Sequence, residues 1–181
     1  MNEPYETGES LESKEVEIRA ALLPDADNAK HFRMSLVATL LEVLDKSAAE
    51  LNVQLLPNFD KPLDRLHGIY RGQEVGEALN LELTLSKFLE DKPETNLFGV
   101  ELVRAIRVNT RWLIAPEEQM TPKSILALAG LAWEEYSLYS PPDSLQPLPP
   151  DTNITLFRGK EFEAQRDGKY GSRANYADCE G

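Results

Sequence analysis

Residues 25–51, DADNAKHFRMSLVATLLEVLDKSAAEL, decide the predicted fold. Apolar residues recur there at alternating spacings of three and four, as they do along one face of a helix: Met34, Val37, Leu41, Leu44, Ala48 and Leu51. Leu36, Leu40 and Val43 widen this face, and Asp25 or Asp27 can cap the start of the helix. A face this broad favours a helix that packs in a bundle over an isolated coiled coil.

Similar patterns predict further helices on both sides of this segment. Residues 94–114 carry apolar residues at helical spacing. Thr121-Pro122 suits a helix start, because Thr accepts hydrogen bonds from free N–H groups and Pro lacks an N–H that would need a partner. Short segments at residues 16–23 and 60–71 complete the set. The predicted fold class is therefore mainly α, a bundle of about four to five helices.

Residues 73–91 leave the secondary structure open. Within them, residues 79–85 alternate leucine with polar residues, which is typical of a strand. A helix is favoured, because leucine forms helices well and Thr84 is the only β-branched residue between Ala78 and Phe88. If the segment is a strand, the fold is α+β, with a small sheet built from residues 51–56, 79–85 and 152–158.

Charge and proline content divide the chain into four parts. The formal net charge is -12, and an acidic start contributes to it. Five prolines fall between residues 140 and 150, which indicates an extended, semi-rigid spacer. The predicted organisation is an acidic leader at 1–10, a helical body at 11–139, a Pro-rich spacer at 140–151 and a polar C-terminal tail at 152–181. No internal sequence repeat is evident.

Composition and motifs argue against the commonest enzyme and cofactor classes. The single cysteine, Cys179, can form neither an internal disulfide nor a zinc site. The phosphate-binding loop, the G-x-G-x-x-G fingerprint and the G-x-S-x-G elbow do not occur. We therefore expect no metal, no cofactor and no catalysis. No apolar run approaches the roughly 18 residues of a membrane span, and the start does not read as a signal peptide, so we expect a cytoplasmic protein without a membrane partner.

One histidine suggests an alternative, catalytic function. His67 follows Asp64 by three positions, so the two side chains would be neighbours on a helix. Such a pair can act as a general base with an orienting carboxylate, and Arg71 follows one turn later. A small enzyme with its site near His67 is therefore an alternative, and it requires a concave pocket around these residues.

Arginines in the predicted 94–114 helix form the best candidate binding surface. Arg104, Arg107 and Arg111 would share one polar stripe, and Trp112 beside them could anchor an interface. Arginine guanidinium groups bind carboxylates and phosphates, so the stripe suits an acidic partner. A solvated face, or ion pairs within the same protein, is the alternative.

The C-terminal tail supplies the remaining candidate binding residues, in which aromatic and basic side chains alternate: Phe157, Arg158, Phe162 and Tyr170. Such spacing can stack the bases of single-stranded nucleic acid. Residues 158–173 contain five basic and three acidic side chains, so their net charge is only +2. This charge is low for a segment that binds phosphates.

The predicted function is therefore that of a non-catalytic, acidic helical protein that binds another protein as an adaptor, inhibitor or assembly factor. A nucleic-acid-associated accessory protein, using the arginine stripe or the tail, is the alternative from another class. The identity of the partner and the oligomeric state stay open at this stage.

Overall fold

The structure is a computed structural model, and it describes residue 10 and residues 14–56, 62–70, 74–142 and 145–168. The chain divides into two compact units, Met1–Val103 and Arg104–Gly181. The described part of the first unit contains β1 (Glu15–Leu22), β2 (Lys30–Ser35), α1 (Leu40–Glu50), β3 (Arg65–Ile69), β4 (Val75–Ala78), α2 (Leu85–Asp91) and β5 (Leu97–Glu101).

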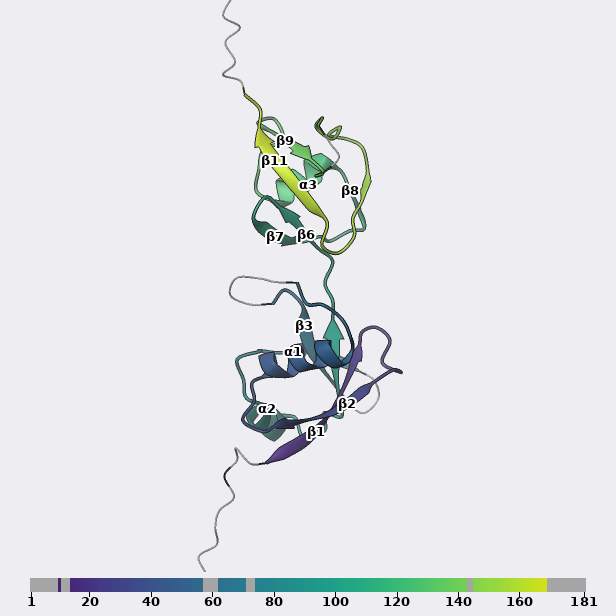
Figure 1. The fold of residues 1–181 in the computed structure, drawn as a ribbon, viewed down its shortest axis with the longest axis vertical. Coiled ribbons are helices and arrows are strands. Elements are labelled where there is room, and N and C mark those ends of the chain that lie inside the picture. The colour runs from purple at the N-terminus through teal and green to yellow at the C-terminus, as the bar shows by residue number, and fades with distance from the viewer. Residues whose placement is uncertain (1–9, 11–13, 57–61, 71–73, 143–144, 169–181) are drawn as a thin grey trace, which may run out of the picture. The chain divides into compact units, whose positions relative to one another are not determined.

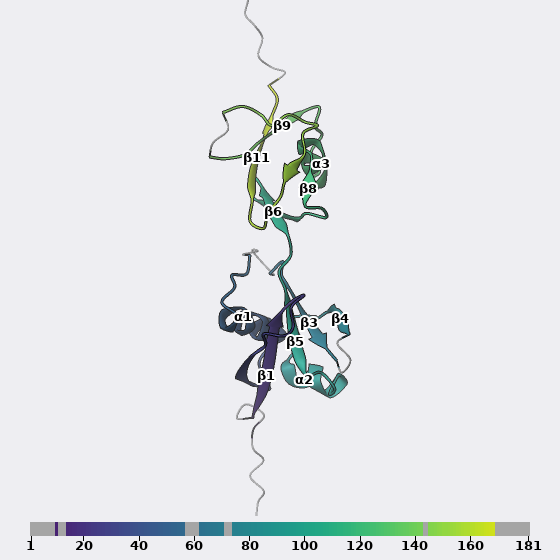
Figure 2. The same cartoon turned by 90° about the vertical axis from the view of Figure 1, so that its right-hand side faces the viewer.

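The first unit is a five-stranded mixed sheet in the order β2-β1-β5-β3-β4. β1 pairs in parallel with β5, and the other neighbouring strands are antiparallel. Figure 1 shows α1 lying across the sheet, and in Figure 2 β1, β5, β3 and β4 follow one another across it. The sheet is therefore mixed, with one parallel pair, β1 and β5, among antiparallel neighbours.

The core of the first unit lies between the sheet and its two helices. Strand residues alternate between the two faces, so every second side chain points toward α1. The buried cluster is Ile18, Ala20, Phe32, Leu40, Val43, Leu44, Leu66, Leu85, Phe88, Phe98 and Val100.

Local sequence signals set both ends of α1. The Thr39 side chain accepts from the backbone N–H of Glu42, and the Glu42 carboxylate accepts from the backbone N–H of Thr39, which forms a capping box. At the other end Asn52 has a φ of 55°, and the N–H of Val53 donates to Ala48 O at 2.9 Å. This bond closes a Schellman motif, which satisfies carbonyls that the helix leaves free.

The second unit has a four-stranded sheet in the order β7-β6-β11-β9 and a two-stranded sheet of β10 and β8. β6 and β11 are parallel, whereas β6–β7 and β11–β9 are antiparallel. Its described elements are β6 (Ala105–Val108), β7 (Arg111–Ile114), β8 (Gln119–Met120), α3 (Pro122–Leu128), β9 (Tyr136–Tyr139), β10 (Ile154–Thr155) and β11 (Glu161–Arg166).

Four strands and one helix of each unit share one arrangement. The order β7-β6-β11-β9 matches β2-β1-β5-β3 position by position, with the same parallel central pair and one helix after the first hairpin. The helix ends match as well, because Thr121 caps α3 and Gly130 has a φ of 74°. The N–H of Leu131 donates to Leu126 O at 2.9 Å, as Val53 does to Ala48 in the first unit.

The predicted helical bundle is wrong, because sheets dominate both units. The long helix expected at residues 25–51 combines two elements, β2 and α1. Phe32 and Met34 alternate with exposed polar residues and face the core from β2. The apolar residues of β2 happen to lie three or four positions from those of α1. Together the two sets therefore resemble one continuous apolar face of a helix.

Four other segments expected to be helical also contain strands. Residues 16–22 belong to β1, and the expected helix at 60–71 contains β3. Residues 94–114 form β5, β6 and β7, with a two-residue turn between the last two at Asn109, whose φ is 55°. Residues 73–91 contain β4, a turn and α2, which starts after the N-cap Thr84. The alternative small sheet is wrong as well, since residues 51–56 and 79–85 form no strand. The predicted Thr121 N-cap with Pro122 in the first turn is confirmed.

The expected spacer and tail contribute to the second unit. The N–H of Leu148 donates to Leu138 O at 2.8 Å, so part of the Pro-rich segment lies along β9. β11 comes from the expected tail and pairs with both β6 and β9. The acidic leader at 1–9 lies outside the described residues.

Candidate functional site

In each unit, one face of the sheet packs against the helices and the other, helix-free face does not. In the first unit, Leu66, Phe98 and Val100 point to the core, so their strand neighbours point to the other face. A second, smaller apolar cluster lies on that face, at Ala21, Ile69 and Leu97, packed by Leu23, Ala26 and Ala29. Beside it lies a polar cluster formed by Arg65, His67 and Glu101.

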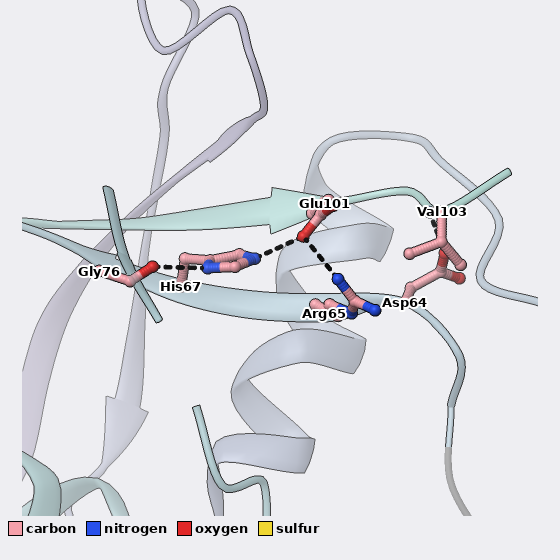
Figure 3. Close-up of polar contacts among 6 residues, drawn as sticks. All are labelled: Asp64, Arg65, His67, Gly76, Glu101 and Val103. Atoms are coloured by element: carbon pink, nitrogen blue, oxygen red, sulfur yellow. Dashed lines mark hydrogen bonds and ion pairs between the residues drawn. The ribbon is translucent and has the colours of Figure 1, made fainter. Parts of the chain in front are cut away.

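His67 is the centre of this polar cluster (Figure 3). Its Nδ1–H donates to Gly76 O of β4 at 2.9 Å, and its Nε2 lies 2.6 Å from Glu101 Oε2 of β5. Arg65 Nη1 lies 3.8 Å from the same carboxylate oxygen. The His67 side chain is 11% exposed, compared with 38% for Glu101. Three adjacent strands are therefore joined through one imidazole ring.

This arrangement occupies both ring nitrogens of His67. A carbonyl oxygen only accepts, so Nδ1 is the donor toward Gly76, while Nε2 contacts the Glu101 carboxylate. Both ring nitrogens thus contact groups of the protein itself. The register of β3 and β4 shifts between His67 and Ile69, so the ring bridges the strands where their pairing is irregular.

The predicted Asp64–His67 pair does not form. Asp64 is 1% exposed and accepts the N–H groups of Leu56 at 2.9 Å and Val103 at 3.0 Å. Figure 3 shows its carboxylate beside Val103, away from the ring of His67. The two side chains are not neighbours because residues 65–69 form a strand, in which residues three positions apart face opposite sides. Arg71 lies outside the described residues.

We expect His67 to stabilise the first unit. His67→Ala leaves Gly76 O and Glu101 without this partner, which should lower the free energy of unfolding by about 1–3 kcal/mol. His31→Ala is the matched control, because the His31 side chain bonds Glu17 at the surface, where the side chains are 53% and 66% exposed. Urea unfolding of both variants checks this, and equal losses would contradict a special role for His67.

The helix-free face of the second sheet carries an arginine–tryptophan pair. Arg107 lies opposite Trp112 on β7 and opposite Glu161 on β11. Its guanidinium carbon is 5.9 Å from the centre of the Trp112 ring, and Nη2 donates to Glu161 Oε2 at 2.9 Å. Arg107 Nε is buried without a hydrogen-bond partner among the described residues. We call Arg107, Trp112 and Glu161 the Arg107–Trp112 surface.

The other predicted binding residues are dispersed. Arg111 points to the helix side, where Nη1 donates to Ala129 O at the end of α3 at 3.0 Å, and Arg104 lies half-buried just before β6. The expected single stripe therefore does not form, because the segment is a hairpin and not a helix. Phe162 is 2% exposed in the second core, and Phe157 is 62% exposed beside Arg158. Tyr170 lies outside the described residues.

Comparisons with known proteins add no family to this description, since no family model and no curated protein matches the chain. Among the described residues, no group of three or more His, Cys, Asp or Glu side chains is arranged to hold a metal ion. Within the same residues, every helix is too short or too polar to cross a membrane.

Proposed function

We propose that this chain is a non-catalytic protein-binding protein, and that the Arg107–Trp112 surface of the second unit is its main contact. The fold carries no argument for this, because one topology supports many functions. The proposal is supported by one observation: an aromatic ring and a guanidinium group are paired in fixed register on a helix-free sheet face.

Trp and Arg are the residues that most often dominate protein interfaces. Here the cross-strand pairing and the bond to Glu161 already restrict Arg107, so less side-chain freedom is lost on binding. Exposed apolar area continues along the strand, since Ile114 is 40% exposed. The bond from Arg107 to Glu161 also offsets its charge locally, which favours a protein partner over a phosphate backbone.

The polar groups of the first unit support the proposal that the protein is non-catalytic. Both nitrogens of His67 are engaged within the protein, and Asp64 accepts backbone N–H groups. These contacts support a structural role for His67 and Asp64. We further propose that the protein acts in the cytoplasm, where its single cysteine needs no disulfide partner.

Substitution of the Arg107–Trp112 surface should remove partner binding. Proteins captured by the full chain from native-host lysate would be identified and then measured against Arg107→Ala and Trp112→Ala. We expect binding to weaken about tenfold or more for each variant. Arg166→Ala is the matched control, because Arg166 is a more exposed arginine of the same sheet that also forms an ion pair, with Glu135 at 3.1 Å.

A partner that binds all three variants equally would contradict this surface as the interface. Captured nucleic acid whose binding falls steeply with salt would instead favour the nucleic-acid alternative. A shortened chain that ends at Tyr139, before the Pro-rich segment, cannot replace the full chain in this test. It lacks β11, which pairs with β6 and β9 in the sheet that presents Arg107.

A further inference from the structure

The two edges of the second sheet differ in how they are covered. In the order β7-β6-β11-β9, the edge strands are β7 and β9. The β9 edge is occupied in part, because the N–H of Leu148 donates to Leu138 O at 2.8 Å. In the described part of the chain, β7 pairs only with β6. An uncovered edge strand offers free N–H and C=O groups to another strand.

The backbone groups that face this free edge belong to Trp112 and Ile114. The N–H of Ala115 donates to Arg104 O at 2.8 Å, so residue 115 bonds toward β6. In an antiparallel pair, alternate residues bond toward the same neighbour. Arg111 and Leu113 therefore also bond toward β6, and the peptide groups of Trp112 and Ile114 point away from it.

The side chains of β7 lack the usual protection of an edge. The equivalent strand of the first unit, β2, carries Lys30 and Arg33, and charged residues discourage strand addition. β7 reads Arg-Trp-Leu-Ile. Its single charged residue, Arg111, is engaged with Ala129 O through Nη1. The rest of the strand is apolar, and Ile114 is 40% exposed.

We propose that a second copy of the chain binds this edge, with the two β7 strands antiparallel about a twofold axis at Leu113. Trp112 then lies opposite Ile114 of the partner subunit, and Ile114 lies opposite Trp112 of the partner subunit. Each of these pairs exchanges two backbone hydrogen bonds, four in all. The paired side chains are aromatic and β-branched, a favourable cross-strand combination.

Self-complementarity identifies a second copy as the occupant. When residues 112–114 pair antiparallel with the same residues of a second copy, each apolar side chain lies opposite another apolar side chain. Arg111 meets Ala115 of the partner subunit, so the pairing brings no like charges together. The pairing window is short, because Pro116 has no N–H and the turn at Asn109 ends the strand on the other side. We therefore expect a weak, concentration-dependent dimer.

Sedimentation equilibrium of the full chain, from micromolar to millimolar concentration, tests the proposal. The parent should show a monomer–dimer equilibrium. Ile114→Pro removes an outward N–H while leaving the bonds from β7 to β6, and it should lower the association constant about tenfold or more. Leu145→Lys is the control, because Leu145 is a 99% exposed apolar residue of the same unit outside β7.

A chain that stays monomeric at every concentration overturns the proposal, and so does a dimer that Ile114→Pro leaves intact. Ile114→Lys is the second variant, because it blocks the edge by charge without constraining the backbone. Circular dichroism of each variant separates loss of association from loss of folding.

Disulfide trapping tests the register. In a Cys179→Ser background, Leu113→Cys should form a cross-linked dimer on oxidation, because position 113 faces itself across the axis. Thr110→Cys is the control, since Thr110 is more exposed but faces a different residue across the axis. Faster cross-linking at position 110 than at position 113 would overturn the proposed pairing.

Discussion

The Leu44→Asp variant should lose the fold of the first unit and keep that of the second. Leu44 is 0% exposed and packs in the core between α1 and the sheet. Removing a buried leucine costs about 2–5 kcal/mol, and the unpaired buried carboxylate adds to this. The sum is comparable with the total stability of a small domain, about 5–15 kcal/mol.

Two optical signals distinguish the units in this experiment. Both tryptophans of the chain, Trp112 and Trp133, lie in the second unit, whereas circular dichroism reports on both. We expect a partial loss of the circular dichroism signal with native tryptophan fluorescence. Ala49→Asp is the control, because it adds the same carboxylate to the exposed side of α1. Parent-like melting of Leu44→Asp would contradict the core assignment, and loss of both signals together would contradict independent units.

The Asp64→Ala variant should be the next most destabilised. The Asp64 carboxylate is buried and accepts two backbone N–H groups, one from Leu56 and one from Val103. These bonds tie the start of β3 to the segment after α1 and to the segment after β5. Leaving both N–H groups without this acceptor should cost about 2–4 kcal/mol.

Two further substitutions make the Asp64 result specific. Asp64→Asn keeps one carbonyl oxygen and should be destabilised by an intermediate amount. Asp45→Ala removes an exposed carboxylate from α1 and should change stability little. Urea unfolding followed by circular dichroism measures the first unit, with tryptophan fluorescence as the internal reference for the second. Equal losses for Asp64→Ala and Asp45→Ala would rule out the structural role.

The candidate sites show which contacts a sequence can reveal. Arg107 and Trp112 were expected beside one another on a helical stripe with Arg104 and Arg111. The stripe does not form, but because the two residues are close in the chain a hairpin places them opposite one another. Glu101 was missed, because it is 34 residues from His67 and no local pattern connects them. Val103 is 39 residues from Asp64, and its partner is a backbone N–H that carries no sequence signal.

The shared arrangement was equally hidden from sequence inspection. Both units contain a parallel strand pair, and α1 and α3 each end in a Schellman motif, yet different residues fill the equivalent positions. Asn52 stands where the second unit has Gly130, since either residue tolerates a positive φ. A topology constrains polarity and backbone conformation more strongly than it constrains residue identity.

By itself the sequence determined the local features of this protein. It determined the helix start at Thr121-Pro122, the capping signal Thr39-x-x-Glu42 and the turn at Asn109. The apolar spacing of residues 25–51 does not reveal the capping signal. These features depend on interactions within a few residues. Only the tertiary structure decided that residues 94–114 are strands, because β5 needs β1 and β6 needs β11 to complete their hydrogen bonds. Those partners are distant in the chain, and a short apolar segment adopts whichever structure its neighbours in space can satisfy.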